Sequence, residues 1–281
     1  MRTLDPETVA GAVAELCRTA ACDLPADVVA ALHATRANER NPRARDILQQ
    51  CIDNARIAAD KRLPICQDTG FAVVFAELGC GVAIESPGLS AAITTGIRRG
   101  YCEGYLRKSI VDDPLFARAN TGDNCPPVIH ISSVPGDHLT LTLAPKGGGS
   151  ENMSQLVMLK PADGRDGVLE AVVEAVIAAD GNPCPPTVVG VGVGGTAETA
   201  MILGKRALLR PIGQPHPDPA YAELEGEILE QINASGIGPQ GLGGDSTALA
   251  VHLEHHPCHI ASLPVAVCLN CHAARHAQVR L

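Results

Sequence analysis

Apolar residues recur with the helical period through the first sixty residues and at several later places. In the segment 5–20, an Asp–Pro start is followed by Val9, Val13 and Leu16, which fall on one helical face. The segment 44–60 repeats this spacing. The same period predicts further helices over residues 88–109, 167–180, 196–209 and 220–235.

Shorter apolar or alternating runs predict strands between these helices. The continuous run 71–75 is typical of a buried strand, and the runs 128–134 and 138–144 flank Pro135-Gly136-Asp137 as a β-hairpin would. Two more strands are predicted at 187–195 and 247–253. Because strands and helices interleave, we expect a mixed α/β (α+β) fold in a single domain, 1–281, with a helical N-terminal region, 1–60, packed on a sheet-containing core.

Composition narrows the class of protein. The chain has 281 residues, of which 46% are hydrophobic, so it can bury a full core. A net charge of −9 and only 2% aromatic residues argue against binding of nucleic acid. The chain contains no run of 18 apolar residues, so no membrane span is predicted. The acidic N-terminus does not resemble a secretory signal. We therefore expect a cytoplasmic protein in a reducing compartment.

The cysteines are the first candidates for chemistry. In a reducing compartment, eleven unevenly spaced cysteines indicate metal ligands and core thiols rather than disulfides. Cys268 and Cys271 form a single C-x-x-C pair, which is a weak zinc signal. From the residues alone, a metal site and the identity of its metal stay open. Core thiols are expected at Cys17, Cys22, Cys51, Cys80 and Cys102, and turn or tail positions at Cys66, Cys125, Cys184, Cys258, Cys268 and Cys271.

Two glycine-rich segments suggest ligand binding of different kinds. "GVGVGG" at 190–195 formally fits a dinucleotide fingerprint, but the acidic residue expected about 20 positions later is replaced by a Pro-rich loop. "KGGGSEN" at 146–152 lacks the Lys-Ser/Thr pair of a phosphate-binding loop. Its backbone N–H groups could hold a carboxylate, and its three glycines favour close approach of a ligand.

Six motifs occur in order along the chain: "PICQDTG", "NTGDNCPPVIH", "KGGGSEN", "CPPTVVGVGVGGTAETA", "GIGPQGLGG" and "HIASLPVAV…CHAARH". Together they resemble one known family, the α subunits of class I iron–sulfur fumarate hydratases and L(+)-tartrate dehydratases. The resemblance covers nearly the whole chain, from Asn38 to His276.

The resemblance implies a [4Fe–4S] cluster held by three cysteines. Motif matching places these ligands at Cys66, Cys184 and Cys271, with Cys268 as the near alternative to Cys271. Three thiolates on four irons leave one iron open as a Lewis acid for a hydroxyl group and a carboxylate.

The resemblance also implies residue roles around that iron. Asp68 lies two residues from Cys66 and is expected to transfer a proton, while Gln67 orients the substrate. Arg107 is expected to pair with a substrate carboxylate. Gly149 would offer a backbone N–H group, and His259 would lie at the same pocket.

The sequence departs from the family in two ways. Cys125 stands where members generally carry threonine. Single-chain relatives continue into a second domain, whereas this chain ends at Leu281. We therefore expect a separate β subunit that completes the substrate pocket in a hetero-oligomer.

The leading hypothesis is a hydro-lyase subunit that acts on a small dicarboxylate, hydrating fumarate to (S)-malate. The sister alternative is L(+)-tartrate dehydratase, which forms oxaloacetate, and no residue decides between the two substrates. Two other classes stay open. One is an NAD-dependent oxidoreductase that uses "GVGVGG", and the other is a non-catalytic zinc or iron–sulfur module.

Overall fold

The computed structural model describes residues 2–281, which divide into two compact units. Unit 1 contains residues 2–25, 55–148 and 275–281, and unit 2 contains residues 26–54 and 149–274. Each unit has its own hydrophobic core. The sequence predicts a single domain. That expectation depends on how the two units combine, so it stays a prediction.

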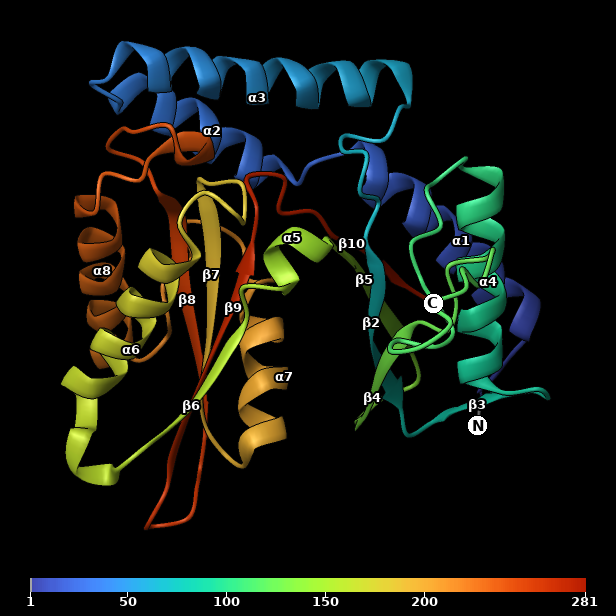
Figure 1. The fold of residues 1–281 in the computed structure, drawn as a ribbon. Coiled ribbons are helices and arrows are strands. Elements are labelled where there is room, and N and C mark those ends of the chain that lie inside the picture. Colours follow the sequence, from blue (N-terminus) through green and yellow to red (C-terminus); the bar gives the residue numbers. More distant parts are fainter. Residues whose placement is uncertain (1) are drawn as a thin grey trace. The chain divides into compact units, whose positions relative to one another are not determined.

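Unit 1 is built on a four-stranded sheet of order β10-β5-β2-β4, with a small parallel pair formed by β1 and β3. The helices α1 and α4 pack against each other and bury their apolar faces on this sheet (Figure 1). Its elements are β1 (Arg2–Leu4), α1 (Pro6–Cys22), β2 (Phe71–Gly79), β3 (Val82–Ile84), α4 (Leu89–Glu103), β4 (Val128–Val134), β5 (Leu139–Lys146) and β10 (Ala277–Arg280).

The predicted hairpin of β4 and β5 is wrong, although both strands exist. The strand β2 lies between them and pairs in parallel with β4 and antiparallel with β5. Five consecutive buried residues, 72–76, explain this central place, because such a strand is stable only when neighbours cover both its edges and its faces. The turn at 135–137 therefore carries the chain across β2.

Unit 2 is a three-layer sandwich around a sheet of order β6-β9-β7-β8. The helices α6 and α8 cover one face and share its core, while α7 covers the other face (Figure 1). Its elements are α2 (Ala26–Asn38), β6 (Gln155–Leu159), a short 3₁₀ turn (Pro161–Asp163), α6 (Gly164–Ala179), β7 (Thr187–Gly194), α7 (Ala197–Ala207), α8 (Pro219–Ala234), a second 3₁₀ turn (Pro239–Gly241), β8 (Ala248–His256) and β9 (Leu263–Asn270). Two helices contribute to both units: α3 (Pro42–Lys61) and the single-turn α5 (Gly148–Glu151).

The "GVGVGG" segment serves the packing of α7. A side chain at Gly192 would place its Cβ 1.9 Å from the carbonyl oxygen of Ala200, and one at Gly190 would lie 2.1 Å from that of Gly204. These glycines let the helix backbone lie directly on β7. A packing role explains the glycines without a dinucleotide.

The predicted mixed α/β fold and helical N-terminal region are confirmed. The helix predicted over 88–109 ends at Glu103, where Gly104 caps it and Tyr105 takes a left-handed backbone with φ of 52°. The chain then turns toward Arg107. Among residues 2–281, no helix combines the length and hydrophobicity needed to cross a membrane.

Candidate active site

The "CQDTG" turn of unit 1 leads directly into β2. Cys66 is half-buried, and its sulfur accepts the backbone N–H of Asp68 at 3.4 Å. The same thiol lies 3.3 Å from the side-chain oxygen of Gln67, which is exposed. The turn thus holds a partly accessible sulfur, the kind of donor atom that soft metal ions bind.

The carboxylate of Asp68 is oriented by backbone amides. One oxygen accepts the N–H of Gly70 at 3.0 Å, and the other accepts the N–H of Gly148 at 2.7 Å. A Cβ at Gly147 would lie 3.4 Å from the second oxygen, so the glycine run allows the backbone to approach the acid closely. The conformation of the catalytic candidate is therefore set by backbone groups.

Buried side chains donate hydrogen bonds to the carbonyl groups of the same turn. The guanidinium of Arg275 donates to the carbonyl of Asp68 at 2.5 Å. The hydroxyl of Tyr101 donates to the next two carbonyls at 2.8 and 3.0 Å, and Asn124 donates to that of Gly70 at 3.2 Å. Burial raises the pKa of Tyr101, so its hydroxyl stays a proton donor.

Arg107 is connected to the same turn through its backbone. The hydroxyl of Thr69 donates to the carbonyl of Arg107 at 2.9 Å, and the arginine side chain is exposed. Unit 1 thus brings together Cys66, Gln67, Asp68 and the segment that carries Arg107.

In unit 2, Cys184 and Cys271 meet at one end of the sheet. Cys184 precedes β7 and Cys271 follows β9, and these neighbouring antiparallel strands pair Val188 with Asn270. The backbone N–H of His272 donates to the carbonyl of Cys184 at 3.1 Å. Cys184 is exposed and Cys271 is half-buried.

Gln240 joins the two segments that carry these cysteines. Its side-chain amide donates to the carbonyl of Pro185 at 2.9 Å and lies 3.0 Å from Nδ1 of His272. Its backbone N–H also donates to Pro185, at 2.8 Å. Gln240 adopts a left-handed φ of 56°, which costs about 1–3 kcal/mol for such a residue and is maintained by these contacts.

Two further thiols of unit 2 differ in their access to this end of the sheet. Burial, with smaller contributions from the nearby Cys271 and Cys184, raises the pKa of Cys51 to about 11, so three thiols lie near one another. Cys268 is fully buried beneath α7, where its thiol donates to the carbonyl of Met201 at 3.9 Å. The C-x-x-C pair therefore does not form one open site, because Cys268 is enclosed by the packing of the helix.

Gly149 lies beside the Cys184 loop within unit 2. A Cβ at this position would be 3.4 Å from the carbonyl oxygen of Asn182. Two residues later, Glu151 pairs with Lys205 at 2.5 Å and so ties α5 to α7. The backbone of Gly149 is thus held close to one of the cysteines that the sequence singled out.

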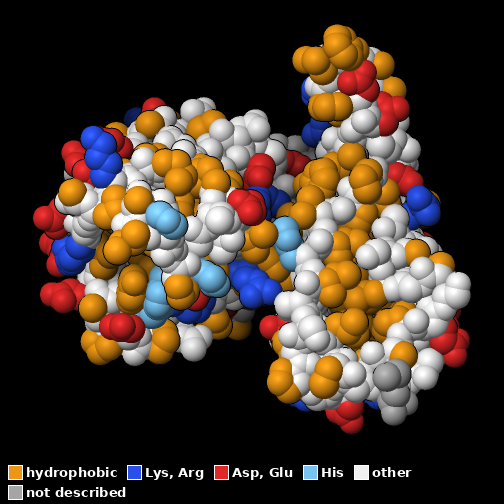
Figure 2. Space-filling model, turned by 90° about the horizontal axis from the view of Figure 1, so that it is seen from below, with side chains coloured by type: hydrophobic (Ala, Val, Ile, Leu, Met, Phe, Trp, Pro, Cys, Tyr) orange, Lys and Arg blue, Asp and Glu red, His pale blue; other side chains and the backbone are white. Residues whose placement is uncertain are grey.

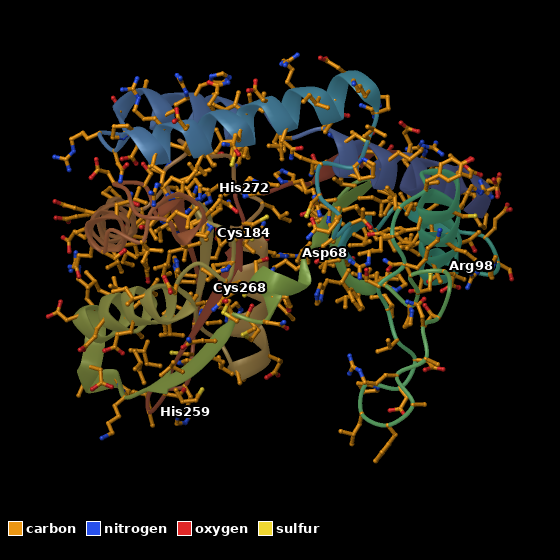
Figure 3. The ribbon with its side chains drawn as sticks, turned by 45° about the horizontal axis from the view of Figure 1, so that its top comes forward. Asp68, Arg98, Cys184, His259, Cys268 and His272 are labelled. Atoms are coloured by element: carbon orange, nitrogen blue, oxygen red, sulfur yellow. The ribbon has the colours of Figure 1, made fainter. Side chains whose placement is uncertain are left out.

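His259 lies at the opposite end of this sheet from Cys184. It belongs to the connection between β8 and β9, whereas Cys184 and Cys271 lie at the start of β7 and the end of β9 (Figure 3). An eight-residue strand such as β9 spans about 26 Å at roughly 3.3 Å per residue. The structure therefore does not bring His259 together with these two thiols.

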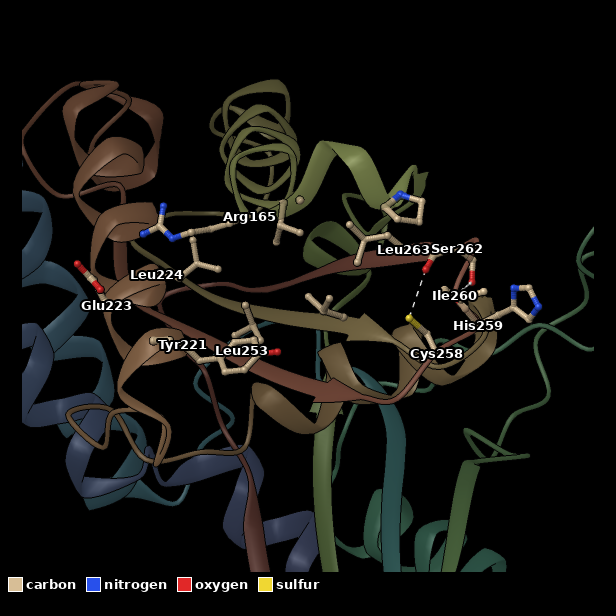
Figure 4. Close-up of a pocket in the computed structure, with 15 residues that line it drawn as sticks. Arg165, Tyr221, Glu223, Leu224, Leu253, Cys258, His259, Ile260, Ser262 and Leu263 are labelled. Carbon is tan, nitrogen blue, oxygen red and sulfur yellow. Dashed lines mark hydrogen bonds between the residues drawn. The ribbon is translucent and has the colours of Figure 1, made fainter.

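Instead, His259 borders a mostly apolar pocket of about 550 Å³ in unit 2. The pocket is lined by the first turns of α6 and α8 and by the connection 258–263, in which the Cys258 thiol donates to the carbonyl of Ser262 at 3.3 Å (Figure 4). In Figure 2, histidine side chains lie among hydrophobic side chains on the visible face of unit 2. Neither Cys184 nor Cys271 lines the pocket.

Among the other cysteines, two differ from the prediction. Cys17 and Cys22 are buried as expected, but Cys80 and Cys102 are exposed, so their prediction as core thiols is wrong. Cys80 lies in the turn after β2, and Cys102 lies on the outer side of the last turn of α4. Cys125 is buried in unit 1, and its thiol donates to the carbonyl of Thr94 at 3.7 Å.

Sequence reasoning gave no role to three residues that shape these turns. Tyr101 lies within the helix predicted over 88–109, and its two hydrogen bonds to the turn connect segments about thirty residues apart. Gln240 and Arg275 both lie inside recognised motifs, "GIGPQGLGG" and "CHAARH", which was the available signal. The tertiary contacts that give them a role could not be read from the sequence.

Comparison with known proteins agrees with this arrangement of motifs. A family model described as Fumarate hydratase (Fumerase) matches residues 10–280. A protein of Methanocaldococcus jannaschii, named provisionally as L(+)-tartrate dehydratase subunit alpha, is 43% identical over 278 residues, which cover 97% of each chain. The L(+)-tartrate dehydratase subunit alpha of Escherichia coli K12 is 34% identical over 254 residues, covering 90% of this chain and 84% of the relative.

The subunit alpha of Escherichia coli O157:H7 shows a similar relationship, with 35% identity over 256 residues that cover 90% of this chain and 84% of the relative. Hydratases and dehydratases both belong to the hydro-lyases, which add or remove water. The match runs through both units and includes every motif described above. The chain belongs to the fumarate hydratase (Fumerase) family.

Proposed function

We propose that this chain is the α subunit of an iron–sulfur hydro-lyase that interconverts fumarate and (S)-malate. The observation that carries the proposal is the "CQDTG" turn, in which a carboxylate fixed by two backbone amides lies two residues from an accessible thiol. Dehydration of L(+)-tartrate is the second candidate reaction. The names of the relatives favour it, because each is called a tartrate dehydratase subunit.

Class I fumarate hydratases depend on an iron–sulfur cluster, and the donor set of this chain suits one. Cys66, Cys184 and Cys271 would hold it, since all three are at least partly accessible and lie in turns at strand ends. No group of three or more Cys, His, Asp or Glu side chains within 2–281 converges on a single metal ion. A cubane cluster does not need such convergence, because each thiolate binds a different iron.

When bound, a [4Fe–4S] cluster with three thiolates supplies a Lewis-acidic iron that polarises a hydroxyl or carboxylate oxygen. Cys271 suits the role of third cluster ligand better than Cys268 does. Burial under α7 leaves Cys268 without access to an inorganic cluster, whereas Cys271 is half-buried beside Cys184. Cys51 lies near Cys184 and Cys271 but is buried within α3.

Asp68 acts as the proton-transfer group in this proposal. Dehydration of a 2-hydroxy acid requires removal of a weakly acidic C–H proton and protonation of the leaving hydroxyl. A carboxylate serves as acid or base when it is held in a fixed orientation. The N–H groups of Gly70 and Gly148 provide that orientation, and each oxygen retains a second lone pair for the substrate or a water molecule.

Four residues are proposed to bind the dicarboxylate. Gln67 and Arg107 present exposed polar side chains from the same part of unit 1, and a guanidinium can bind a carboxylate through two hydrogen bonds. Gly149 offers its backbone N–H beside the Cys184 loop. His259 has the least structural support, because within unit 2 it lies at the opposite end of the sheet from Cys184.

We propose further that a separate β subunit completes the substrate site in a cytoplasmic hetero-oligomer. The word "alpha" in the names of the relatives supports a partner subunit. In that arrangement this chain provides the cluster ligands and Asp68, and the β subunit provides the remaining groups that recognise the dicarboxylate.

The test is co-expression of this chain with a candidate β subunit, anaerobic purification, and assay of (S)-malate, fumarate and L-tartrate side by side. The proposal predicts about four irons per α chain and reversible hydration of fumarate. Activity on tartrate alone would support the second candidate. Stoichiometric zinc without activity, or saturable binding of NAD, would contradict both.

A further inference from the structure

Arg275 is a buried cation beneath the "CQDTG" turn. It is only 5% exposed, and one nitrogen of its guanidinium, Nη2, donates to the carbonyl of Asp68 at 2.5 Å. Its Nε and Nη1 atoms are buried without a hydrogen-bond partner among residues 2–281. Buried polar atoms in folded proteins normally have a partner, so each exception requires an explanation.

A second arginine, in unit 2, also has Nε and Nη1 atoms without a hydrogen-bond partner among residues 2–281, but its charge is compensated. Arg210 of unit 2 is ion-paired with Glu225, and its Nη1 lies 3.6 Å from Glu254. No carboxylate lies within ion-pair distance of Arg275 in the part of the chain that the structure describes. A buried charge without a counter-charge reduces stability by several kcal/mol.

The hydrogen bond to Asp68 does not by itself require a charged donor. The next two carbonyls of the same turn are bound by the neutral donors Tyr101 and Asn124. A neutral side chain could therefore satisfy the carbonyl of Asp68 at a smaller desolvation cost than an arginine. The positive charge of Arg275 must serve something beyond this hydrogen bond.

We propose that Arg275 is a positioning residue whose buried charge also stabilises anions that bind at the "CQDTG" turn. Its hydrogen bond fixes the backbone of Asp68. Its charge stabilises negative charge that binds at the turn, carried by a reduced cluster or by a dicarboxylate, and this second part rests on the proposed function. Unlike the exposed Arg107, Arg275 acts through the turn rather than by contact with the substrate.

The surroundings of Arg275 support an effect of its field on the turn. Burial raises the pKa of Tyr101, and the charge of Arg275 opposes this rise. Arg275 itself donates to the carbonyl of Asp68, and Tyr101 donates to the two carbonyls that follow, so the guanidinium charge lies against the backbone of the turn. In a buried region such a charge is screened far less than at the surface.

The charge is tested by redox titration of the cluster in the anaerobic complex of this chain with its β subunit. Arg275→Met should shift the midpoint potential to a more negative value, because a nearby positive charge favours the reduced cluster. Arg275→Lys should restore most of the wild-type potential. Arg210→Met, which removes a buried arginine of unit 2, should leave the potential unchanged. A wild-type potential in Arg275→Met, with the cluster in place, would overturn this part of the proposal.

The positioning role is tested without the cluster, by amide hydrogen exchange of the full-length chain. The N–H of Gly70 is bound by the carboxylate of Asp68, so its exchange should accelerate in Arg275→Met and stay slow in Arg210→Met. Unchanged exchange at Gly70 in Arg275→Met would overturn the positioning role. If the wild-type protein holds no cluster, the proposed function fails, and the exchange measurement still decides whether Arg275 positions the turn.

Discussion

The two units present their reactive residues in opposite ways. In unit 1, backbone N–H groups fix a side chain: the carboxylate of Asp68 accepts from Gly70 and Gly148. In unit 2, a side chain fixes the backbone: Gln240 binds the carbonyl of Pro185 and lies beside His272, next to Cys184 and Cys271. The first arrangement sets the orientation of an acid, and the second sets the spacing of two thiols.

This difference matches the chemistry proposed for each unit. A proton-transfer group needs a defined orientation, since misplacement by about 1 Å can cost roughly a hundredfold in rate. A thiolate ligand needs mainly a fixed position of its Cα and access to the metal. Accordingly, the thiol of Cys184 is exposed while its backbone is held, and Asp68 is held at both carboxylate oxygens.

The largest effect is expected for Cys184→Ala. The proposed cluster should be lost completely while the fold is kept, because the side chain is exposed and its removal leaves no internal cavity. Cys51→Ala is the matched control, since Cys51 neighbours Cys184 and Cys271 but is buried in α3. Iron and sulfide analysis with circular dichroism of both variants provides the measurement. Retention of the cluster in Cys184→Ala would remove this residue from the ligand set.

Asp68→Asn should have the next largest effect. The variant should retain the cluster and lose turnover by roughly 10²–10⁴-fold, the range for a positioned acid or base. Asn has nearly the same shape and can accept only one of the two N–H groups, so orientation is affected together with proton transfer. Anaerobic steady-state assays of the complex measure the loss. Wild-type turnover in this variant would exclude Asp68 as the proton-transfer group.

Tyr101→Phe tests the support of the turn in unit 1. Loss of one buried hydroxyl leaves two carbonyls with fewer donors, which should lower the free energy of unfolding by about 1–3 kcal/mol. Urea unfolding of the wild-type and variant chains gives this difference. Faster amide exchange should be confined to unit 1, and an equal increase in both units would argue against a local role of Tyr101.

Gln240→Ala tests the corresponding support in unit 2 and should have the smallest effect on stability. Gln240 is half-buried, so its loss should lower the free energy of unfolding by about 1 kcal/mol. The cluster should nevertheless be released faster in air, since the spacing of Cys184 and Cys271 is less well fixed. The decay of the visible absorption measures this release. Equal decay rates in variant and wild-type protein would show that the thiols are positioned without Gln240.

Much of the fold was predictable, because helical periodicity and buried runs depend on local sequence. The failure at β4 and β5 shows the limit, since the turn at 135–137 is compatible both with a hairpin and with a crossover. The choice depends on where β2 inserts, which no local pattern specifies. Gly190 and Gly192 show the same limit: their spacing fits a nucleotide motif, but their contacts are with α7.

The candidate site was predictable only as a set of motifs. Cys66, Asp68 and Cys184 lie in turns that the sequence itself indicated. The choice between Cys268 and Cys271 required the structure, because Cys268 within β9 is buried whereas Cys271, directly after β9, is half-buried. Arg275 and Gln240 depend on contacts across the fold, so the chain alone could not assign them.

The central claim is that three thiolates of this chain hold an iron–sulfur cluster with one iron open to a dicarboxylate. Mössbauer spectroscopy of the ⁵⁷Fe-enriched, anaerobically purified complex tests it most directly. We predict four irons per α chain, of which one changes its signal when (S)-malate is added. Four irons that do not respond to any dicarboxylate, or the absence of a cubane signal, would contradict the account.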